Sequence, residues 1–273
     1  MVESKKIKMS AVLFIFALAI YILNILGILF TVVLNSISKG WYSGLFPKTF
    51  TLEWYKYTSK EHDILNLLAV TFIVVIAVGL ISLIIALPTA YAMARYDFPL
   101  KNLFMSLFLL PMLLPPMTYG IPLATLLYKL GFATKISGVI IANLVPIVPF
   151  MILILTPFIE QISVNIESAA RMLGASKFVI FSRILIPLIS PGIFTASILS
   201  AVKTISMFEL TFFVAGAKSQ TIIVALFSDA YAAGVRPYQA VDALAVIYFL
   251  IAMSLLMIAL KFVSPTQMVS RLK

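Results

Sequence analysis

The feature that most constrains this chain is a series of apolar runs that contain no charged side chain. A helix needs about 20 mostly apolar residues to cross the hydrocarbon core of a bilayer, and six runs reach or approach that length. They cover residues 9–38, 64–94, 102–128, 136–159, 184–202 and 243–260, and the fifth continues past Lys203 and Glu209. We therefore predict an all-α membrane protein with about six transmembrane helices.

The composition agrees with a chain that lies in lipid. Hydrophobic residues make up 62% of the 273 residues and charged residues 11%, against about 45–50% and about 25% in a soluble domain. The first run is longer than the roughly 7–15-residue core of a cleaved signal peptide, so we expect a retained first helix. Cysteine is absent, which excludes disulfides and thiolate metal ligands. The single histidine, His62, stands beside Glu61 and Asp63, and we expect a solvated loop residue there.

The positions of lysine and arginine predict which helix ends face the cytoplasm, because these residues are retained on that side. With the N-terminus inside, the cytoplasmic set is Lys5, Lys6, Lys8, Arg95, Lys101, Arg171, Lys177, Arg183, Lys261, Arg271 and Lys273. We expect cytoplasmic tails at 1–8 and 264–273 around a transmembrane domain at 9–263. The net charge of +10 is spread over loops, so nucleic acid is not an expected partner.

Prolines and charges inside the apolar runs are candidates for a translocation path. Seven prolines interrupt the third and fourth runs, at Pro111, Pro115, Pro116, Pro122, Pro146, Pro149 and Pro157. Broken helices are tolerated where protein or a water-filled cavity surrounds them. Charges at Lys203 and Glu209 would face a cavity or a partner. We name Lys203, Glu209 and Tyr119 as candidate path residues; kinked packing, structural pairing and a lysine reaching the interface stay open.

No enzymatic site is visible in the sequence. HExxH and nucleophile-elbow motifs are absent, and so are paired carboxylates in a soluble cleft. The segment GAKSQT at 216–221 resembles the end of a phosphate-binding loop, but Lys218 lacks the glycine directly before it. We expect no catalytic residue, metal or cofactor in this chain. Work against a gradient would need nucleotide hydrolysis in another chain.

A compact polar stretch separates the fourth and fifth runs; residues 160–187 are called the polar loop below. Its centre reads ESAARMLGASKF from residue 167. Ser163 or Asn165 can cap a short helix, and Glu167 in the first turn suits the positive end of the helix dipole. Gly174 permits the positive φ of a sharp turn. Beyond it we expect an apolar face resting on the membrane helices, formed by Phe178, Phe181, Ile184 and Leu185.

A spaced pattern runs through the polar loop. From Ser168 it reads S-A-A, three residues, G, nine residues, I, one residue, I-P. This resembles the EAA loop of binding-protein-dependent ABC importer permeases, E-A-A-x3-G-x9-I-x-L-P. The matching positions are Ala169, Ala170, Gly174, Ile184 and Pro187. Ser168 occupies the glutamate position, Glu167 lies one residue earlier, and Ile186 stands in the leucine position. The segments ALPTAYAMARYDFPLKN and NLVPIVPFMILILTPFIEQI extend the resemblance.

The resemblance implies a six-helix type I permease subunit in the plasma membrane of a prokaryote. It implies a second permease subunit, cytoplasmic ABC ATPase subunits that use ATP and Mg²⁺, and an extracytoplasmic substrate-binding protein as partners, besides membrane lipid. The ATPase-coupling residues would be Glu167, Ser168, Ala169, Ala170, Gly174, Ile184 and Pro187. The form LGAS is closer to the spermidine/putrescine, aminoethylphosphonate and ferric-ion branch. An ion-coupled secondary transporter and a membrane scaffold that recruits a soluble partner are the alternatives.

Single cysteines in this cysteine-free chain test the topology. We predict that cysteines at Ser176 and Thr58 label from opposite sides of the membrane, since basic residues place the polar loop inside. The measurement is modification of each variant by an impermeant maleimide in intact and permeabilised cells. Labelling of the Ser176 variant from outside intact cells would refute this topology.

Overall fold

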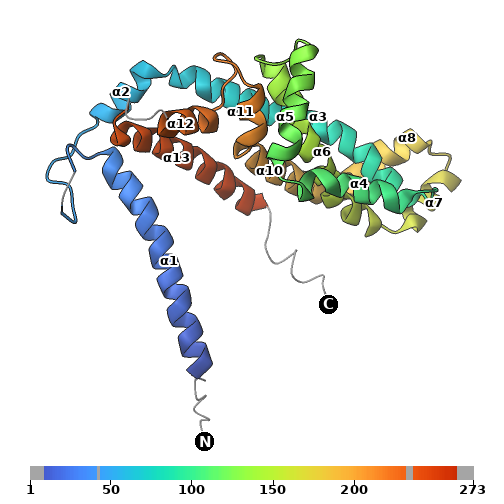
Figure 1. Ribbon diagram of the computed structural model, residues 1–273. Coiled ribbons are helices and arrows are strands. Elements are labelled where there is room, and N and C mark those ends of the chain that lie inside the picture. The colour runs from blue at the N-terminus through green and yellow to red at the C-terminus, as the bar shows by residue number, and fades with distance from the viewer. Residues whose placement is uncertain (1–8, 42–43, 232–235, 263–273) are drawn as a thin grey trace, which may run out of the picture. The chain divides into compact units, whose positions relative to one another are not determined.

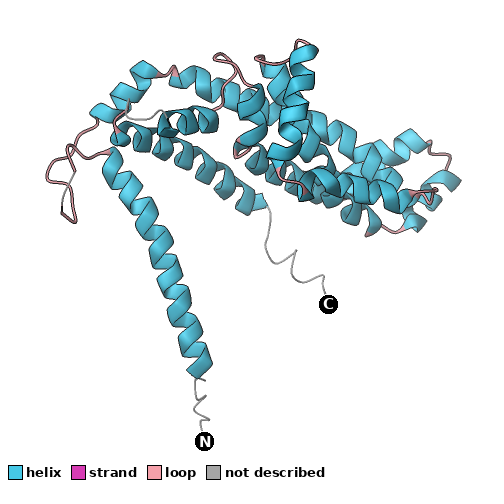
Figure 2. Cartoon of the chain, in the orientation of Figure 1, coloured by secondary structure: helices cyan, strands magenta, loops and turns pink. Residues whose placement is uncertain are grey.

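The computed structural model describes residues 9–41, 44–231 and 236–262. These residues form helices joined by loops (Figure 2), and the one β-type pairing found among them is an isolated bridge between Ser38 and Phe50. The predicted all-α fold is confirmed. Backbone contacts divide the chain into two compact units, Met1–Asp63 with Ser228–Phe249 and Ile64–Phe227 with Leu250–Lys273.

The larger unit is organised around two long helices, α3 (Ile64–Arg95) and α6 (Ile136–Glu160), which pack along each other (Figure 1). Ala86 and Ala90 of α3 are fully buried, as are Ile147 and Leu155 of α6. Small residues let two helix backbones approach closely in lipid, where packing rather than water drives association. The helices α10 (Ser190–Ile205) and α4 (Lys101–Leu113) also pack against α6.

Four straight helices of the described chain are long and apolar enough to cross a bilayer: Ala11–Ser36, Ile64–Arg95, Ile136–Glu160 and Tyr238–Ile258. Two further candidates are bent pairs. One joins α4 to α5 (Pro116–Lys129) at 96°, and the other joins Lys177–Leu188 to α10 at 72°. The number of spans reaches the predicted six when each bent pair is counted as one.

The third predicted run, 102–128, is not a straight helix. It breaks at Leu114, whose ψ of 137° is extended, the conformation that a residue before proline prefers. Pro115 and Pro116 follow, and neither has an amide hydrogen to continue the helical ladder. The prediction of a broken helix is therefore confirmed for the third run, where the break is a 96° turn. It is wrong for the fourth run, because α6 continues through Pro146, Pro149 and Pro157.

The fifth predicted run also differs from a single helix. It is entered through α8 (Lys177–Val179), a π-helical turn η1 (Ile180–Leu185) and α9 (Ile186–Leu188) before α10 begins. Lys203 lies in the last turn of α10, whereas Glu209 begins a separate helix, α11 (Glu209–Val214). The two charges therefore stand on different helices. A further short helix, α12 (Ile222–Tyr231), lies outside the six apolar runs.

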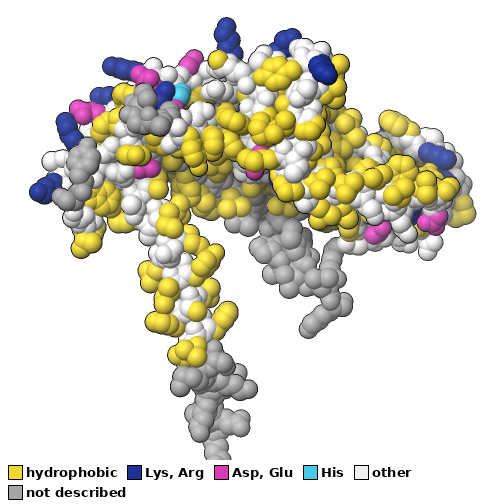
Figure 3. Space-filling view, viewed as in Figure 1, with side chains coloured by type: hydrophobic (Ala, Val, Ile, Leu, Met, Phe, Trp, Pro, Cys, Tyr) yellow, Lys and Arg dark blue, Asp and Glu magenta, His cyan; other side chains and the backbone are white. Residues whose placement is uncertain are grey.

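The smaller unit contains α1 (Met9–Ser36), α2 (Glu53–Glu61) and the first part of α13 (Tyr238–Phe262). None of the apolar window of α1 is buried, and its hydrophobic side chains stand out in the space-filling view (Figure 3). Thr58 of α2 is buried and donates a hydrogen bond to the carbonyl of Ala240 at 3.1 Å. The exposed neighbour Ser59 is therefore the better position for the labelling experiment.

His62 is not a solvated loop residue, contrary to the sequence expectation. Its Nε2 lies 2.6 Å from Oδ2 of Asp229, whose side chain is 7% exposed. The guanidinium of Arg236 contacts the same carboxylate at 3.2 Å and lies 3.8 Å from Glu61. Asp229 and Arg236 are more than 160 residues from His62 in sequence, and this separation is why the local pattern gave no sign of the cluster.

A glycine at a helix contact gives a test of this packing. A Cβ added at Gly192 of α10 would lie 2.5 Å from the ring of Phe158 in α6. We expect Gly192→Ala to destabilise the folded chain by about 1–3 kcal/mol, the usual cost of overpacking. Gly27→Ala in α1 is the matched control, because nothing lies within 4 Å of its added Cβ. Equal thermal midpoints for the two purified variants in detergent would contradict the α6–α10 contact.

Candidate functional site

The polar loop folds as a short capped helix, a left-handed turn and a helical return. The helix α7 (Val164–Met172) is capped by Ser163, whose hydroxyl accepts a hydrogen bond from the amide of Asn165 at 3.3 Å. Glu167 lies in its first turn, as predicted. Gly174 has φ of 85°, which confirms the predicted positive-φ turn. The amides of Leu173, Gly174 and Ala175 donate to the last carbonyls of α7 and close this turn.

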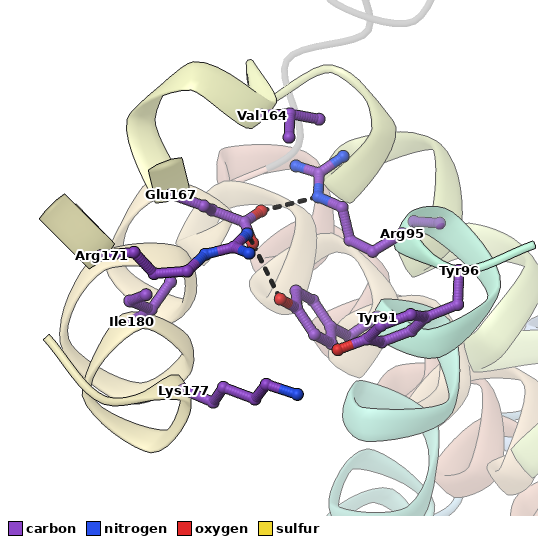
Figure 4. Close-up of a pocket in the computed structure, with 9 residues that line it drawn as sticks. Tyr91, Arg95, Tyr96, Val164, Glu167, Arg171, Lys177 and Ile180 are labelled. Carbon is purple, nitrogen blue, oxygen red and sulfur yellow. Dashed lines mark hydrogen bonds and ion pairs between the residues drawn. The ribbon is translucent and has the colours of Figure 1, made fainter. Parts of the chain in front are cut away.

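Glu167 ties the polar loop to the end of α3. Its side chain is 2% exposed, and its Oε1 accepts from Nε of Arg95 at 2.6 Å. The hydroxyl of Tyr91 donates to Oε2 at 2.8 Å, and Nη2 of Arg95 donates to the carbonyl of Ile162 at 2.7 Å. Figure 4 shows these side chains meeting between the loop and α3. Glu167 thus points into the protein, not toward the exposed face of α7.

Sequence reasoning did not identify Arg95 and Tyr91 as partners of Glu167. Arg95 ends α3 and Tyr91 precedes it by one helical turn, so both project from the same side of the helix. The sequence signal for this pair is a tyrosine and an arginine one helical turn apart at the end of a predicted span. Nothing in the sequence indicates that a carboxylate about 70 residues later meets them.

The remaining residues of the resemblance divide into exposed and buried positions. Ser168 and Ala169 are exposed, Ala170 is buried, and Pro187 is exposed. Ile184 is half-buried and Leu185 is fully buried. Phe181 packs edge-on to Tyr91 with ring centroids 5.5 Å apart. The expected apolar face is therefore present, with one correction given next.

Phe178 does not join that inner face. It is 76% exposed, and Met172 and Leu173 beside the turn are 85% and 90% exposed. The π-helical turn at Ile180–Leu185 shifts the facing of the side chains that precede it, so helical spacing from Leu185 misplaced Phe178. Three large apolar side chains thus surround the Gly174 turn on the outside of the polar loop.

The three candidate path residues are not brought together by direct ion pairs or hydrogen bonds in the described chain. Lys203 places its ammonium 5.0 Å from the ring centroid of Phe150 in α6, a favourable cation–π contact. Glu209 is half-buried at the start of α11. Tyr119 packs against a small core cluster that includes Leu210 of α11.

Tyr119 has a structural role in addition to its proposed place in the translocation path. Pro115 has no amide to donate to the carbonyl of Pro111, four residues earlier. The hydroxyl of Tyr119 donates to that carbonyl at 3.3 Å. It thereby satisfies a backbone acceptor that lipid would leave unpaired.

A buried amide in α6 was not anticipated from the sequence. Nδ2 of Asn143 donates to the carbonyl of Val139 at 2.9 Å and to the hydroxyl of Thr211 in α11 at 3.0 Å. Its Oδ1 is buried and has no hydrogen-bond partner among the described residues. Asn143 is therefore a further polar group in the bundle interior, next to the short helix that carries Glu209.

The arrangement of the larger unit is shared with solved transporters. A chain in the crystal structure of a bacterial ABC transporter involved in the import of the acidic polysaccharide alginate superposes with a TM-score of 0.79 at 20% identity. The superposition covers 97% of this chain and 100% of that one. This likeness concerns the fold.

Sequence comparison identifies the family. A probable ABC transporter permease protein of Pyrococcus horikoshii is 32% identical over 60% of each chain, and the trehalose transport system permease protein of Mycobacterium tuberculosis is 31% identical over 57% of each. The chain thus spans about 60% of the length of the curated relatives that it matches. A family model matches residues 82–268, a range that includes the polar loop and both of its anchors on α3. The chain accordingly belongs to the binding-protein-dependent transport system inner membrane components.

Proposed function

We propose that this chain is the permease subunit of an ATP-driven, binding-protein-dependent ABC importer for a small solute. The observation that carries the proposal is the build of the polar loop. Its Glu167 is locked to Arg95 and Tyr91 of α3, while Met172, Leu173 and Phe178 project outward. A loop fixed at its base and apolar at its tip is suited to dock in a groove of a soluble partner.

In this proposal the partner is an ATPase subunit, and the polar loop transmits its movement. The exposed apolar side chains would seat in the ATPase when ATP and Mg²⁺ bind there. A displacement of α7 passes through the Glu167–Arg95 ion pair to α3, because that contact is short and almost free of water. Since α3 packs along α6, the movement reaches the helix that carries Asn143 and Phe150.

The other proposed partners follow from the same assignment. A second permease subunit, identical or homologous, would complete the pathway, and the uncovered apolar surface of α1 is available to lipid or to that subunit. An extracytoplasmic substrate-binding protein would deliver the solute. The proposed location is the plasma membrane of a prokaryote with both termini cytoplasmic.

The comparisons bear on the solute class. Curated relatives are named for the transport of trehalose and of sulfate. They do not support the narrower polyamine, phosphonate or ferric-ion branch that the LGAS form favoured. Nor does the family favour the alternative of an ion-coupled secondary transporter. Lys203, Glu209 and Tyr119 remain proposed path residues for a solute selected by the external binding protein.

Substitution of Gly174 tests the coupling role. Gly174→Val forces a β-branched residue into a left-handed turn, at a cost of at least about 1–2 kcal/mol. We expect the variant to insert normally but to lose most ATP-driven uptake in proteoliposomes that contain the complete transporter. Gly174→Asn is the matched control, because asparagine tolerates positive φ and there is open space around the added Cβ. Full uptake by the valine variant would exclude the coupling role of this turn.

The Glu167–Arg95 ion pair gives a second test. Arg95→Gln leaves a buried carboxylate without its cation, and breaking a buried pair in this way costs about 3–5 kcal/mol. We expect a clear fall in the thermal midpoint of the purified permease, partly restored in the Arg95→Gln/Glu167→Gln double variant, which holds no unpaired charge. Arg171→Gln is the control, since its guanidinium is 54% exposed and 4.0 Å from Glu167. A double variant no more stable than Arg95→Gln would argue against the pair as the anchor of the loop.

A further inference from the structure

A pocket of about 220 Å³ opens between the polar loop and the end of α3. The residues of its wall that carry charges or hydroxyl groups are Tyr91, Arg95, Tyr96, Glu167, Arg171 and Lys177. Figure 4 shows Arg171 and Lys177 extending from the loop side, opposite Tyr91 and Tyr96. The pocket is therefore closed by side chains from both of the elements that the Glu167 anchor joins.

The charges of this pocket do not balance. It holds two more cations than carboxylates, and its one carboxylate, on Glu167, is already matched by Arg95 at 2.6 Å. Arg171 reaches that carboxylate at 4.0 Å, the outer limit of an ion pair. Lys177 is exposed and forms no ion pair with any residue that the structure describes. An anion in the pocket would therefore meet two cations with little competition from the protein.

The pocket also offers a second tyrosine and lies at the end of a predicted span. Tyr91 uses its hydroxyl on Glu167, whereas the Tyr96 ring is 46% exposed and its packing partner is Tyr91. Because Arg95 is the last residue of α3, the pocket lies where that span leaves the apolar layer. Tyrosine and arginine at this level are typical of the lipid headgroup region.

We propose that this pocket binds the phosphate group of an anionic phospholipid. The Arg171 guanidinium and the Lys177 ammonium hold the phosphate oxygens, and the Tyr96 hydroxyl donates a further hydrogen bond. The acyl chains lie against the apolar layer that α3 spans. Basic pockets between transmembrane helices on the cytoplasmic side are suited to such headgroups. A free phosphate has the same chemistry, but it gains nothing from the position at the end of a span.

The bound lipid would bridge α7 and α3 beside the Glu167–Arg95 pair. The lipid would then stiffen the loop that contacts the ATPase. This consequence is the one part of the inference that rests on the proposed function. Lipid binding itself is independent of that function, and the experiment therefore uses the full-length permease without an ATPase. The two proposals can then fail separately.

The experiment measures the affinity of the permease for a spin-labelled phosphatidylglycerol in phosphatidylcholine nanodiscs. The test variant is Arg171→Gln/Lys177→Gln, and both side chains are exposed, so the fold should persist. Each cation near a headgroup contributes about fivefold to the association constant, and we expect the double variant to bind roughly 25-fold more weakly. Tyr96→Phe, which removes one hydroxyl, should weaken binding by a smaller factor. Arg183→Gln, an exposed cation of the same loop outside the pocket, should bind as the unchanged chain does.

Three results would overturn the proposal. The first is an equal affinity of the double variant and the Arg183→Gln control for phosphatidylglycerol. The second is displacement of the labelled lipid by millimolar inorganic phosphate from the unchanged chain, which would make a free anion the ligand. The third, from a separate binding assay with an added ATPase, is a double variant that retains lipid affinity and loses ATPase binding, which would assign the pocket to a protein contact.

Discussion

A carboxylate that is almost completely removed from water is stable only when its charge is matched, and the geometry of the polar loop depends on this requirement at Glu167. Arg95 supplies the charge and Tyr91 a hydrogen bond. Both belong to the last turns of α3, so the first turn of α7 has a fixed position against that helix. With Glu167 facing inward, helical geometry places Met172 and the Gly174 turn on the outside. One ion pair thus determines which surface of the loop is exposed.

A second constraint comes from prolines in an apolar chain. Each proline removes an amide donor, and lipid offers no water to replace it. At Pro115 the chain bends sharply. The hydroxyl of Tyr119 donates a hydrogen bond to the carbonyl of Pro111, which Pro115 cannot bond because it has no amide hydrogen. The bend brings α5 against α11, the helix that begins with Glu209. The proline break and the placement of this charge are therefore parts of one arrangement.

The local features of the polar loop could be predicted because they depend on near neighbours in sequence. The Ser163 cap, the position of Glu167 in the first turn and the positive φ of Gly174 all follow from short-range rules. The partners of Glu167 and of His62 could not, because they lie about 70 and more than 160 residues away. Phe178 was misplaced because the π-helical turn after it departs from the helical period that the prediction assumed. The positions of the charged residues predicted the number of apolar runs, but not the bends within them.

The pocket beside the Glu167–Arg95 contact holds more positive charge than this ion pair requires. Arg95 alone matches Glu167, yet Arg171 and Lys177 project into the same pocket. The extra cations do not weaken the Glu167–Arg95 ion pair, because Arg171 and Lys177 stay in contact with water. The surplus becomes useful when an anion enters, because the pocket then gains a charge-assisted contact without opening the Glu167–Arg95 pair. Two separate sets of groups thus serve the loop. The Glu167–Arg95 pair sets its position, and Arg171 and Lys177 are available to bind an anion. This separation allows the membrane surface to act on the loop while its attachment to α3 stays intact.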